Sequence, residues 1–169
     1  DWLERYTYPA EMAYANPEVA ALGAAQFLDA LLAHGTTAAM VFPTVHRISV
    51  DALFEAARVR NMRIIAGKCL MDRNAPDGLR DDVVRAEHDC RALIEAWHQR
   101  GRAHYAMTVR FAPTSTSQQL AMAARMLDDH PSVGFQTHLA ENHDEIAWVR
   151  SLYPQARSYL DVYASHGLL

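Results

Sequence analysis

The sequence has little of what several common classes of protein require. It contains 2 cysteines among 169 residues, and Cys69 and Cys90 stand in different segments without a CxxC pair or a neighbouring histidine cluster. No thiolate metal site is therefore predicted, and we expect both thiols to be buried in a reducing cytosol. The PCxxC pair of the zinc deaminases that bind their metal through cysteines is also missing, which excludes that class.

The sequence also lacks clusters of like charge and long apolar runs. The 16 Lys and Arg residues stand against 20 Asp and Glu, which gives a net charge of −4 without a block of like charges. Nucleic acids and anionic membranes normally require a basic patch, so neither is an expected partner. The stretch DWLERYTYPAE lacks a signal-peptide pattern, and no apolar run approaches the roughly 18 residues of a membrane span. We expect a cytoplasmic protein with a small, weakly charged ligand.

Apolar stretches typical of buried strands alternate with amphipathic helical patterns along the chain. The strands are predicted at residues 36–43, 63–71, 103–113 and 133–140, and the helices at 17–34, after Ser49 as an N-cap, and at 79–99, 117–129 and 144–152. This alternation predicts an α/β fold, a parallel sheet covered by helices. Four strand–helix pairs fit either a small doubly wound sheet or half of a (β/α)8 barrel.

Polar residues gather where each predicted strand ends. They are Pro43, Thr44 and His46 after the first strand, Asp72, Arg73 and Asn74 after the second, Arg110 with Phe111 in the third, and His138, Glu141 and Asn142 in the fourth. Ligand sites lie at the carboxyl ends of parallel strands, so these groups should face one common site. We expect residues 72–74 mainly to form a turn, and His46 to be a hydrogen-bonded structural residue.

The stretch FQTHLAENHDE, residues 135–145, ends the fourth strand on a histidine and places a glutamate three positions later. Such a pair suits a catalytic metal site, in which His138 binds the ion and Glu141 takes a proton from the metal-bound water. The pair alone also fits a polar residue satisfied at the rim of a sheet. A catalytic zinc ion normally has three protein ligands, and this chain offers one obvious candidate.

Longer blocks of sequence make the interpretation more specific. The chain resembles the guanine deaminases of the amidohydrolase superfamily from its first residue to its last, in the blocks DWLERYTYPAEMAY, LLAHGTTAAMVFPTVH, VDALFEAARVRNMRIIAGKCLMDRNAPD, VRFAPTSTSQQL and QTHLAENHDEIAWV. The resemblance implies a zinc-dependent (β/α)8 barrel enzyme of purine catabolism, usually a homodimer, that hydrolyses guanine to xanthine and ammonia.

The same resemblance implies roles for individual residues. His138 would be a zinc ligand at the end of the fifth barrel strand, within a THxxE pattern that Thr137 and Glu141 complete. Glu141 would move protons between the zinc-bound water, the purine ring and the leaving amine. Arg110 would donate hydrogen bonds to the carbonyl edge of the purine, and Phe111 would pack on its ring. A planar guanidinium and an aromatic face suit a flat heterocycle.

Other ligands of that family have no match in this sequence. The family carries a His-x-His pair on the first strand, a histidine on the sixth and an aspartate on the eighth, and none is present here. We therefore expect residues 1–169 to form a single incomplete domain, strands two to five of the barrel. With two sheet edges unpaired, the isolated piece should be marginally stable or associate, lack deaminase activity and bind zinc weakly.

Two alternatives stay open. The chain could belong to another amidohydrolase that acts on a different purine, a pterin or a triazine, because THxxE is common to the superfamily whereas Arg110 and Phe111 would select the substrate. From a different class, it could be a non-catalytic α/β module that binds a small molecule without metal. The presence or absence of the missing ligands in adjoining sequence would separate this module from an enzyme.

Overall fold

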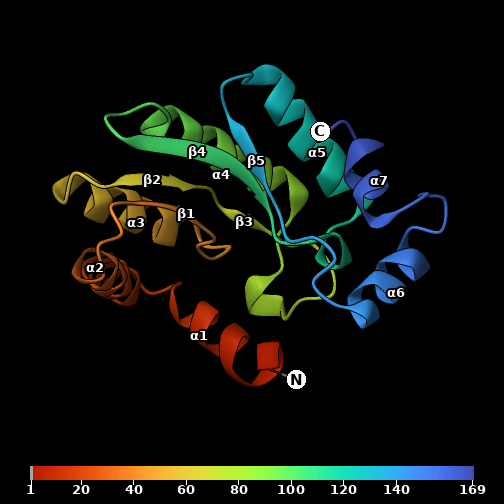
Figure 1. Cartoon of the computed structure of the whole chain (residues 1–169), viewed down its shortest axis with the longest axis horizontal. Coiled ribbons are helices and arrows are strands. Elements are labelled where there is room, and N and C mark those ends of the chain that lie inside the picture. Colours follow the sequence, from red (N-terminus) through yellow and green to blue (C-terminus); the bar gives the residue numbers. More distant parts are fainter. Residues whose placement is uncertain (1) are drawn as a thin grey trace.

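A parallel β-sheet runs through the middle of the computed structural model, which describes residues 2–169 (Figure 1). Its strands are β1 (Ala38–Val41), β2 (Arg63–Ala66), β3 (Cys69–Leu70), β4 (Ala103–Val109) and β5 (Gly134–Gln136). Strand β1 pairs with β2, β2 with β4 and β4 with β5, while β3 extends the line of β2 along the second half of β4. Neighbours in the sheet are thus consecutive in the chain, as in the wall of a (β/α)8 barrel. The predicted α/β fold is confirmed.

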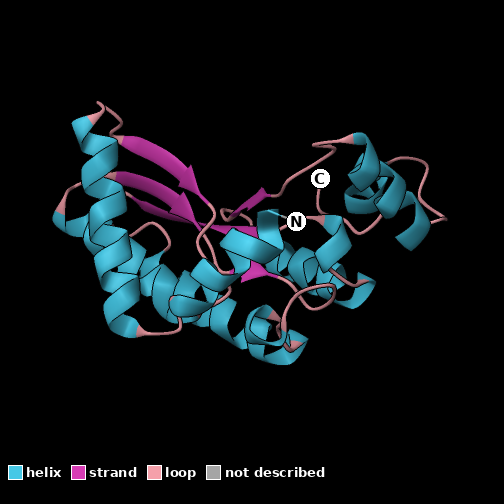
Figure 2. Cartoon of the chain, turned by 90° about the horizontal axis from the view of Figure 1, so that it is seen from below, coloured by secondary structure: helices cyan, strands magenta, loops and turns pink. Residues whose placement is uncertain are grey.

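Helices connect the strands and cover the sheet. They are α2 (Pro17–Ala33), α3 (Arg47–Val59), α4 (Val83–Trp97), α5 (Ser117–Asp129), α6 (His143–Leu152) and α7 (Tyr159–Ala164). The chain starts with a π-helical turn, η1 (Leu3–Thr7), and α1 (Tyr8–Ala13), and two short 3-10 turns follow strands, η2 (Asp77–Leu79) and η3 (Ala112–Thr114). Figure 2 shows the strands along one side of the molecule, with most of the helices packed below them. Within residues 2–169, no helix has the length and apolar character needed to cross a membrane.

Side-chain caps explain several helix boundaries. The side chains of Asn16, Asp82, Thr116 and Asn142 each accept a hydrogen bond from a backbone N–H in the first turn of the helix that follows. Such caps satisfy amides that have no partner within the helix. The predicted helices at 17–34, 117–129 and 144–152 therefore agree with the structure to within one residue at each end.

The predicted cap at Ser49 is wrong. Helix α3 begins at Arg47, and Ser49 lies in its first turn, where its hydroxyl donates to the backbone oxygen of His46 (2.8 Å). The hydroxyl also lies 2.7 Å from that of Thr44, which accepts a hydrogen bond from the His46 backbone N–H. The turn that leads into α3 is thus held by Thr44, two residues ahead of the helix N-cap.

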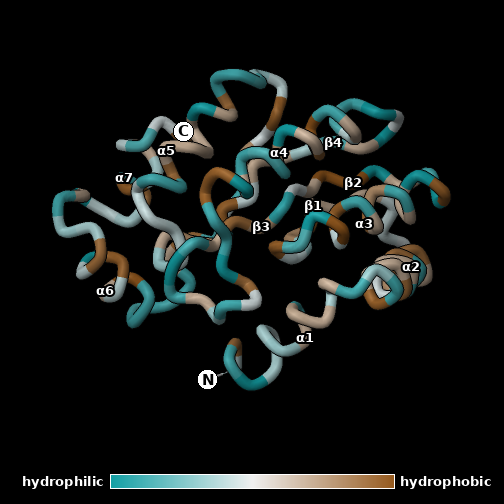
Figure 3. Tube along the Cα trace, turned by 180° about the vertical axis from the view of Figure 1, so that it is seen from behind, coloured by the Kyte–Doolittle hydropathy of each residue, from teal (hydrophilic) through white to brown (hydrophobic). Residues whose placement is uncertain are grey.

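Alternation along the strands separates two faces of the sheet. In β4, Tyr105, Met107 and Val109 join the large apolar core beneath the helices, whereas Thr108 lies on the opposite face. There its hydroxyl accepts a hydrogen bond from the Gln136 side-chain amide of β5 (2.9 Å). Side chains two positions apart in a strand share a face. Arg110 follows Thr108 by two positions and His138 follows Gln136 by two, so both lie on this second face. Figure 3 shows the strongly apolar positions along β2 and β3 in the centre of the fold.

The predicted strand at residues 63–71 is interrupted. Strand β2 ends at Ala66 and β3 begins at Cys69. At Gly67 the chain passes so close to β4 that an added Cβ would lie 1.8 Å from the backbone oxygen of Ala106. Lys68 follows with 2% of its surface exposed, and its backbone N–H donates to the Tyr105 hydroxyl (3.1 Å) instead of to a strand partner. The interruption thus results from a close approach that only a glycine permits.

Candidate functional site

The strand ends bring Arg110 and His138 together. Strands β4 and β5 run parallel with Thr108 opposite Gln136, so the residues two positions further on are neighbours as well. The backbone N–H of His138 donates to the Arg110 backbone oxygen (3.0 Å), and the Nδ1 atom of the imidazole lies 2.8 Å from the same oxygen. Two of the predicted site residues therefore meet at one end of the sheet, where ligands of parallel α/β folds bind.

This hydrogen bond fixes the orientation of the His138 ring. A carbonyl oxygen only accepts, so Nδ1 carries the hydrogen, and in a neutral imidazole Nε2 then holds the free lone pair. The ring of Phe42, the residue after β1, lies against the imidazole with the centroids 4.3 Å apart and the planes at 51°. A backbone carbonyl on Nδ1 is the usual support of a histidine that binds metal through Nε2.

The guanidinium of Arg110 is held by the N-terminal helices. Its Nη1 atom donates to Glu11 Oε1 of α1 at 2.5 Å, and both side chains are 14% exposed. The guanidinium carbon also lies 5.7 Å from the centre of the Tyr8 ring. Glu11 stands 99 positions before Arg110 in the chain. Sequence reasoning missed this partner, because no local spacing links an N-terminal glutamate to the end of β4.

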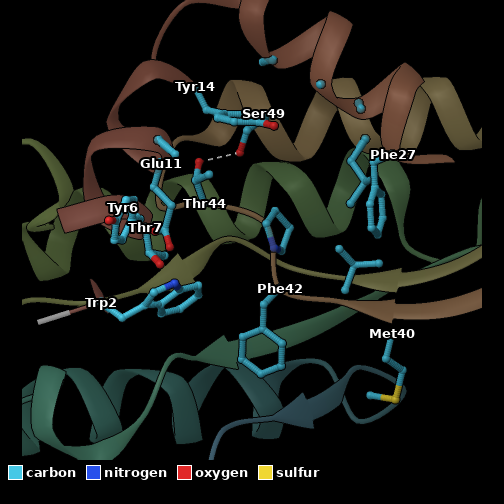
Figure 4. Close-up of a pocket in the computed structure, with 17 residues that line it drawn as sticks. Trp2, Tyr6, Thr7, Glu11, Tyr14, Phe27, Met40, Phe42, Thr44 and Ser49 are labelled. Carbon is cyan, nitrogen blue, oxygen red and sulfur yellow. Dashed lines mark hydrogen bonds between the residues drawn. The ribbon is translucent and has the colours of Figure 1, made fainter. Parts of the chain in front are cut away.

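A cavity of about 630 Å³ opens between the N-terminal helices and strand β1. Apolar side chains form most of its lining, among them Trp2, Phe27 and Phe42 (Figure 4). Thr7 and Glu11 add polar atoms, and two of these, Thr7 Oγ1 and Glu11 Oε2, are buried without a hydrogen-bond partner. An apolar cavity with a few polar groups is typical of a site for a small organic ligand.

Phe111 lies directly after Arg110 but contacts a different group. It is 9% exposed, and its ring meets that of Trp148 on α6 edge to face, with 6.2 Å between the centroids. Since Trp148 is half-exposed, the pair forms an aromatic contact at the surface between the end of β4 and α6. The predicted contact of Phe111 with a substrate ring stays a prediction.

Glu141 lies in the exposed loop between β5 and α6, three residues after His138. The residue before it, Ala140, has a φ of 55°, a left-handed conformation that is uncommon for a residue with a Cβ. Directly after Glu141, the Asn142 side chain caps α6 by accepting from the Glu145 N–H (2.8 Å). The direction of the loop at Glu141 is therefore determined by a strained residue on one side and a helix cap on the other.

Tyr163 of α7 connects the ends of β4 and β5, and neither this residue nor its helix was predicted. Its hydroxyl donates to the His138 backbone oxygen (3.1 Å) and accepts from the Ala112 N–H and the Thr137 hydroxyl, both at 2.9 Å. Burial raises the pKa of this phenol, which keeps the donor proton in place. The THxxE pattern is thus positioned by a buried tyrosine from a later helix of the chain.

The loop after β3 stabilises the turn after β4, as predicted for residues 72–74. The Asp72 carboxylate accepts from the backbone N–H (2.7 Å) and the hydroxyl (2.5 Å) of Thr116. The Arg73 guanidinium and the Asn74 amide donate to the Pro113 backbone oxygen at 3.2 and 2.8 Å. These contacts are structural, and they fix the segment that follows Arg110 and Phe111.

The cysteines offer no reactive thiol to this site, although the Cys69 thiol interacts with the Arg110 guanidinium. Both are free and fully buried, and burial raises the pKa of each thiol to about 12. A thiol with such a pKa stays protonated at neutral pH and is a poor nucleophile and metal ligand. The expectation of buried thiols is confirmed.

The described residues offer one side chain that is arranged to bind a metal ion. Among residues 2–169, no three His, Cys, Asp or Glu side chains come close enough together to hold a metal. His138 is nevertheless arranged as a ligand, because the Arg110 backbone oxygen occupies its Nδ1 and leaves Nε2 without a hydrogen bond to any described residue. A catalytic zinc ion would require further ligands from outside these residues.

Comparisons of the sequence and of the structure with known proteins agree with one another. The model of the amidohydrolase family matches residues 1–169. The chain is 54% identical to guanine deaminase of Escherichia coli over 168 residues, which cover 99% of this chain and 38% of that protein.

Solved structures show the same relation. The structure of the E. coli guanine deaminase superposes with a TM-score of 0.97 over 99% of this chain and 39% of its own. A guanine deaminase from C. acetobutylicum, solved with guanine in its active site, is 29% identical with a TM-score of 0.95, over 99% of this chain and 40% of its own. An atrazine chlorohydrolase from Arthrobacter aurescens, solved with zinc, shares the fold at 21% identity and a TM-score of 0.80, over 90% of this chain and 36% of its own.

Proposed function

Because this chain belongs to the amidohydrolase family, we propose that it forms part of a guanine deaminase, which hydrolyses guanine to xanthine and ammonia. The chain spans 38% of the length of the E. coli guanine deaminase, so the activity is proposed for a longer polypeptide that includes residues 1–169 as an incomplete barrel domain. The observation that carries the proposal is the junction of His138 with Arg110. One backbone oxygen orients the imidazole whose Nε2 would bind the metal, beside the side chain that would recognise the purine.

His138 would hold the metal through Nε2, together with ligands from outside the chain. Zinc, when bound, would polarise a water molecule and lower its pKa to about 7. Glu141 would accept one proton from that water and pass it to the purine ring, and would then carry the second proton derived from the water to the leaving amine. Its position in an exposed loop suits a carboxylate that must reach more than one atom of the substrate.

Arg110 and Phe111 would bind the purine. The guanidinium has five N–H donors, of which one binds Glu11 and another interacts with the Cys69 thiol, so others remain for the carbonyl edge of the ring. The Phe111 ring, beside Trp148, would pack on the heterocycle. A partly buried, hydrogen-bonding arginine favours a substrate with a carbonyl, which separates guanine from amino-heterocycles that have none.

The test uses the full-length protein. Formation of xanthine from guanine is followed in the ultraviolet, and bound zinc is measured on the same samples. Glu141→Gln should keep the metal and lose about 10³-fold in kcat, since a proton-transfer group contributes about 10² to 10⁴. His138→Asn should lose both metal and turnover, whereas His34→Asn, at an exposed histidine of the α2 terminus, should change neither. Full activity of the His138 variant would refute the proposal.

Three further properties are part of this proposal. The resident metal is zinc, the whole protein is a homodimer, and it acts in the cytoplasm in purine catabolism. Metal analysis of protein purified without added metal and a measurement of mass in solution test the first two. The isolated residues 1–169 should be inactive and bind zinc weakly, because one histidine cannot hold the ion.

A further inference from the structure

Glu11 has one oxygen in use and one without a partner. Oε1 accepts from Arg110 at 2.5 Å, while Oε2 is buried and makes no hydrogen bond. A carboxylate only accepts, and a buried acceptor without a donor is unfavourable by about 1–3 kcal/mol, more if it is charged. Glu11 lines the cavity beside β1, and Figure 4 shows its side chain extending from α1 into that space. The free oxygen is therefore placed to receive a donor from a ligand.

A second orphaned atom lies in the same lining. The hydroxyl oxygen of Thr7, four residues before Glu11, is also buried without a partner. Residues four apart on a helical segment lie on one face, and Figure 4 shows Thr7 and Glu11 close together in the cavity. The unpartnered polar atoms are thus grouped on one wall, which a ligand with a complementary polar edge would satisfy.

Glu11 lines the cavity and Arg110 does not, but their contact would offer a specific pattern to a ligand that reaches both side chains. Arg110 has only N–H donors, and Glu11 directly beside it has only acceptors. The complementary group is a carbonyl next to a ring N–H, the lactam edge of an oxopurine. The opposite charges compensate each other, so a neutral ring meets no net charge at this point.

We propose that Glu11 is a specificity-determining residue of the proposed guanine deaminase: Oε1 orients the Arg110 guanidinium, and Oε2 accepts a hydrogen bond from the substrate N–H beside the carbonyl. This inference rests on the proposed function. It adds a residue of α1 to a site otherwise formed at strand ends, and it assigns recognition of the carbonyl and of the N–H to two different side chains.

The test compares guanine with 1-methylguanine, in which a methyl group replaces the hydrogen of that N–H, in the full-length protein. The unsubstituted enzyme should prefer guanine in kcat/KM by at least about 100-fold, because the methyl group removes the donor and meets Oε2. In Glu11→Ala, both substrates lose the orientation of Arg110 but only guanine loses its acceptor, so kcat/KM for guanine should fall by about 100-fold more than that for 1-methylguanine and the preference disappears. Glu18→Gln, at an exposed glutamate of α2, is the matched control and should keep the preference.

Glu11→Gln is a second variant, for the case that Glu11→Ala does not fold. This variant keeps the size of the side chain and an oxygen that accepts from Arg110. The amide nitrogen that then faces the substrate donates instead of accepting, so the enzyme should again lose its preference for guanine. An unchanged preference in Glu11→Ala or Glu11→Gln, with zinc content and melting temperature retained, overturns the proposal. If the unsubstituted protein turns over neither compound, the proposed function itself fails, a result distinct from an active enzyme with an unchanged preference.

Discussion

The buried ion pair of Lys68 and Asp81 offers a sharp test of the fold around the site. The Lys68 ammonium lies 2.8 and 2.9 Å from the two oxygens of Asp81, and the side chains are 2% and 5% exposed. The ammonium also donates to the backbone oxygen of Val45, in the turn after β1. The pair therefore links the ends of β1 and β2 to the loop before α4.

Asp81→Asn should destabilise the protein far more than loss of a surface pair. It leaves the buried ammonium with neutral acceptors only, and breaking such a pair from one side is unfavourable by about 3–5 kcal/mol. The amide introduced by this substitution still offers one oxygen to Lys68, so we expect the lower end of that range, about 3 kcal/mol. Asp77→Asn removes the partner of Arg80 in a pair whose side chains are 91% and 49% exposed, and should change stability by less than about 1 kcal/mol.

Urea unfolding of the full-length protein measures the difference. With a slope of about 2–3 kcal/mol per molar urea, a loss of about 3 kcal/mol lowers the midpoint by about 1 M. The double variant Lys68→Met with Asp81→Leu should recover most of this loss, because replacing both charges with apolar groups leaves neither one unpaired. Equal midpoints for Asp81→Asn and Asp77→Asn would show that Lys68 does not depend on its partner, and the reasoning would be wrong.

Two further predictions concern the sheet. Gly67→Ala should destabilise the protein by about 3 kcal/mol or more, because the Cβ would lie 1.8 Å from Ala106 O, whereas Gly134→Ala, with its nearest atom at 3.8 Å, should be nearly neutral in thermal melting. Burial lowers the pKa of His98 from 6.5, and its Nδ1 accepts from the Tyr105 N–H (3.0 Å), so the folded state favours the neutral ring. The unfolded chain then takes up the proton first as the pH falls, so the free energy of unfolding should decrease below about pH 6.5. His98→Gln should flatten this dependence, and an equally steep decline would contradict it.

Much of the fold was predictable because local patterns determine it. Helix α5 matches its predicted range, since Thr116 caps an amphipathic repeat that ends before His130. The adjacency of Arg110 and His138 also followed from sequence, because the carboxyl ends of neighbouring parallel strands meet at one edge. Both predictions needed only the period of a helix or a strand.

The missed features depend on contacts between distant segments. Strand β2 stops at Gly67 because the chain there meets the backbone of Ala106 in another strand, and no pattern within β2 contains that information. Glu11 was overlooked for the same reason, since its relation to Arg110 spans 99 positions. Tyr163 reads as an apolar helix residue, yet its hydroxyl holds the backbone of His138. Sequence periodicity thus predicts which face a residue occupies, but not which distant group it meets.

Strand register brings His138, the proposed metal ligand, next to Arg110, the side chain proposed to bind the substrate. Thr108 faces Gln136 across β4 and β5, and two residues later the same parity brings His138 to the Arg110 backbone oxygen. A slip of β5 by one residue would turn His138 to the helical face and away from Arg110, so the two proposed roles could no longer meet in one site. Gln136 prevents this, because its amide donates to Thr108 Oγ1 and to Val41 O, both at 2.9 Å, and thereby ties three strands. The chemistry proposed for this site therefore depends on a buried amide that itself would contact neither metal nor purine.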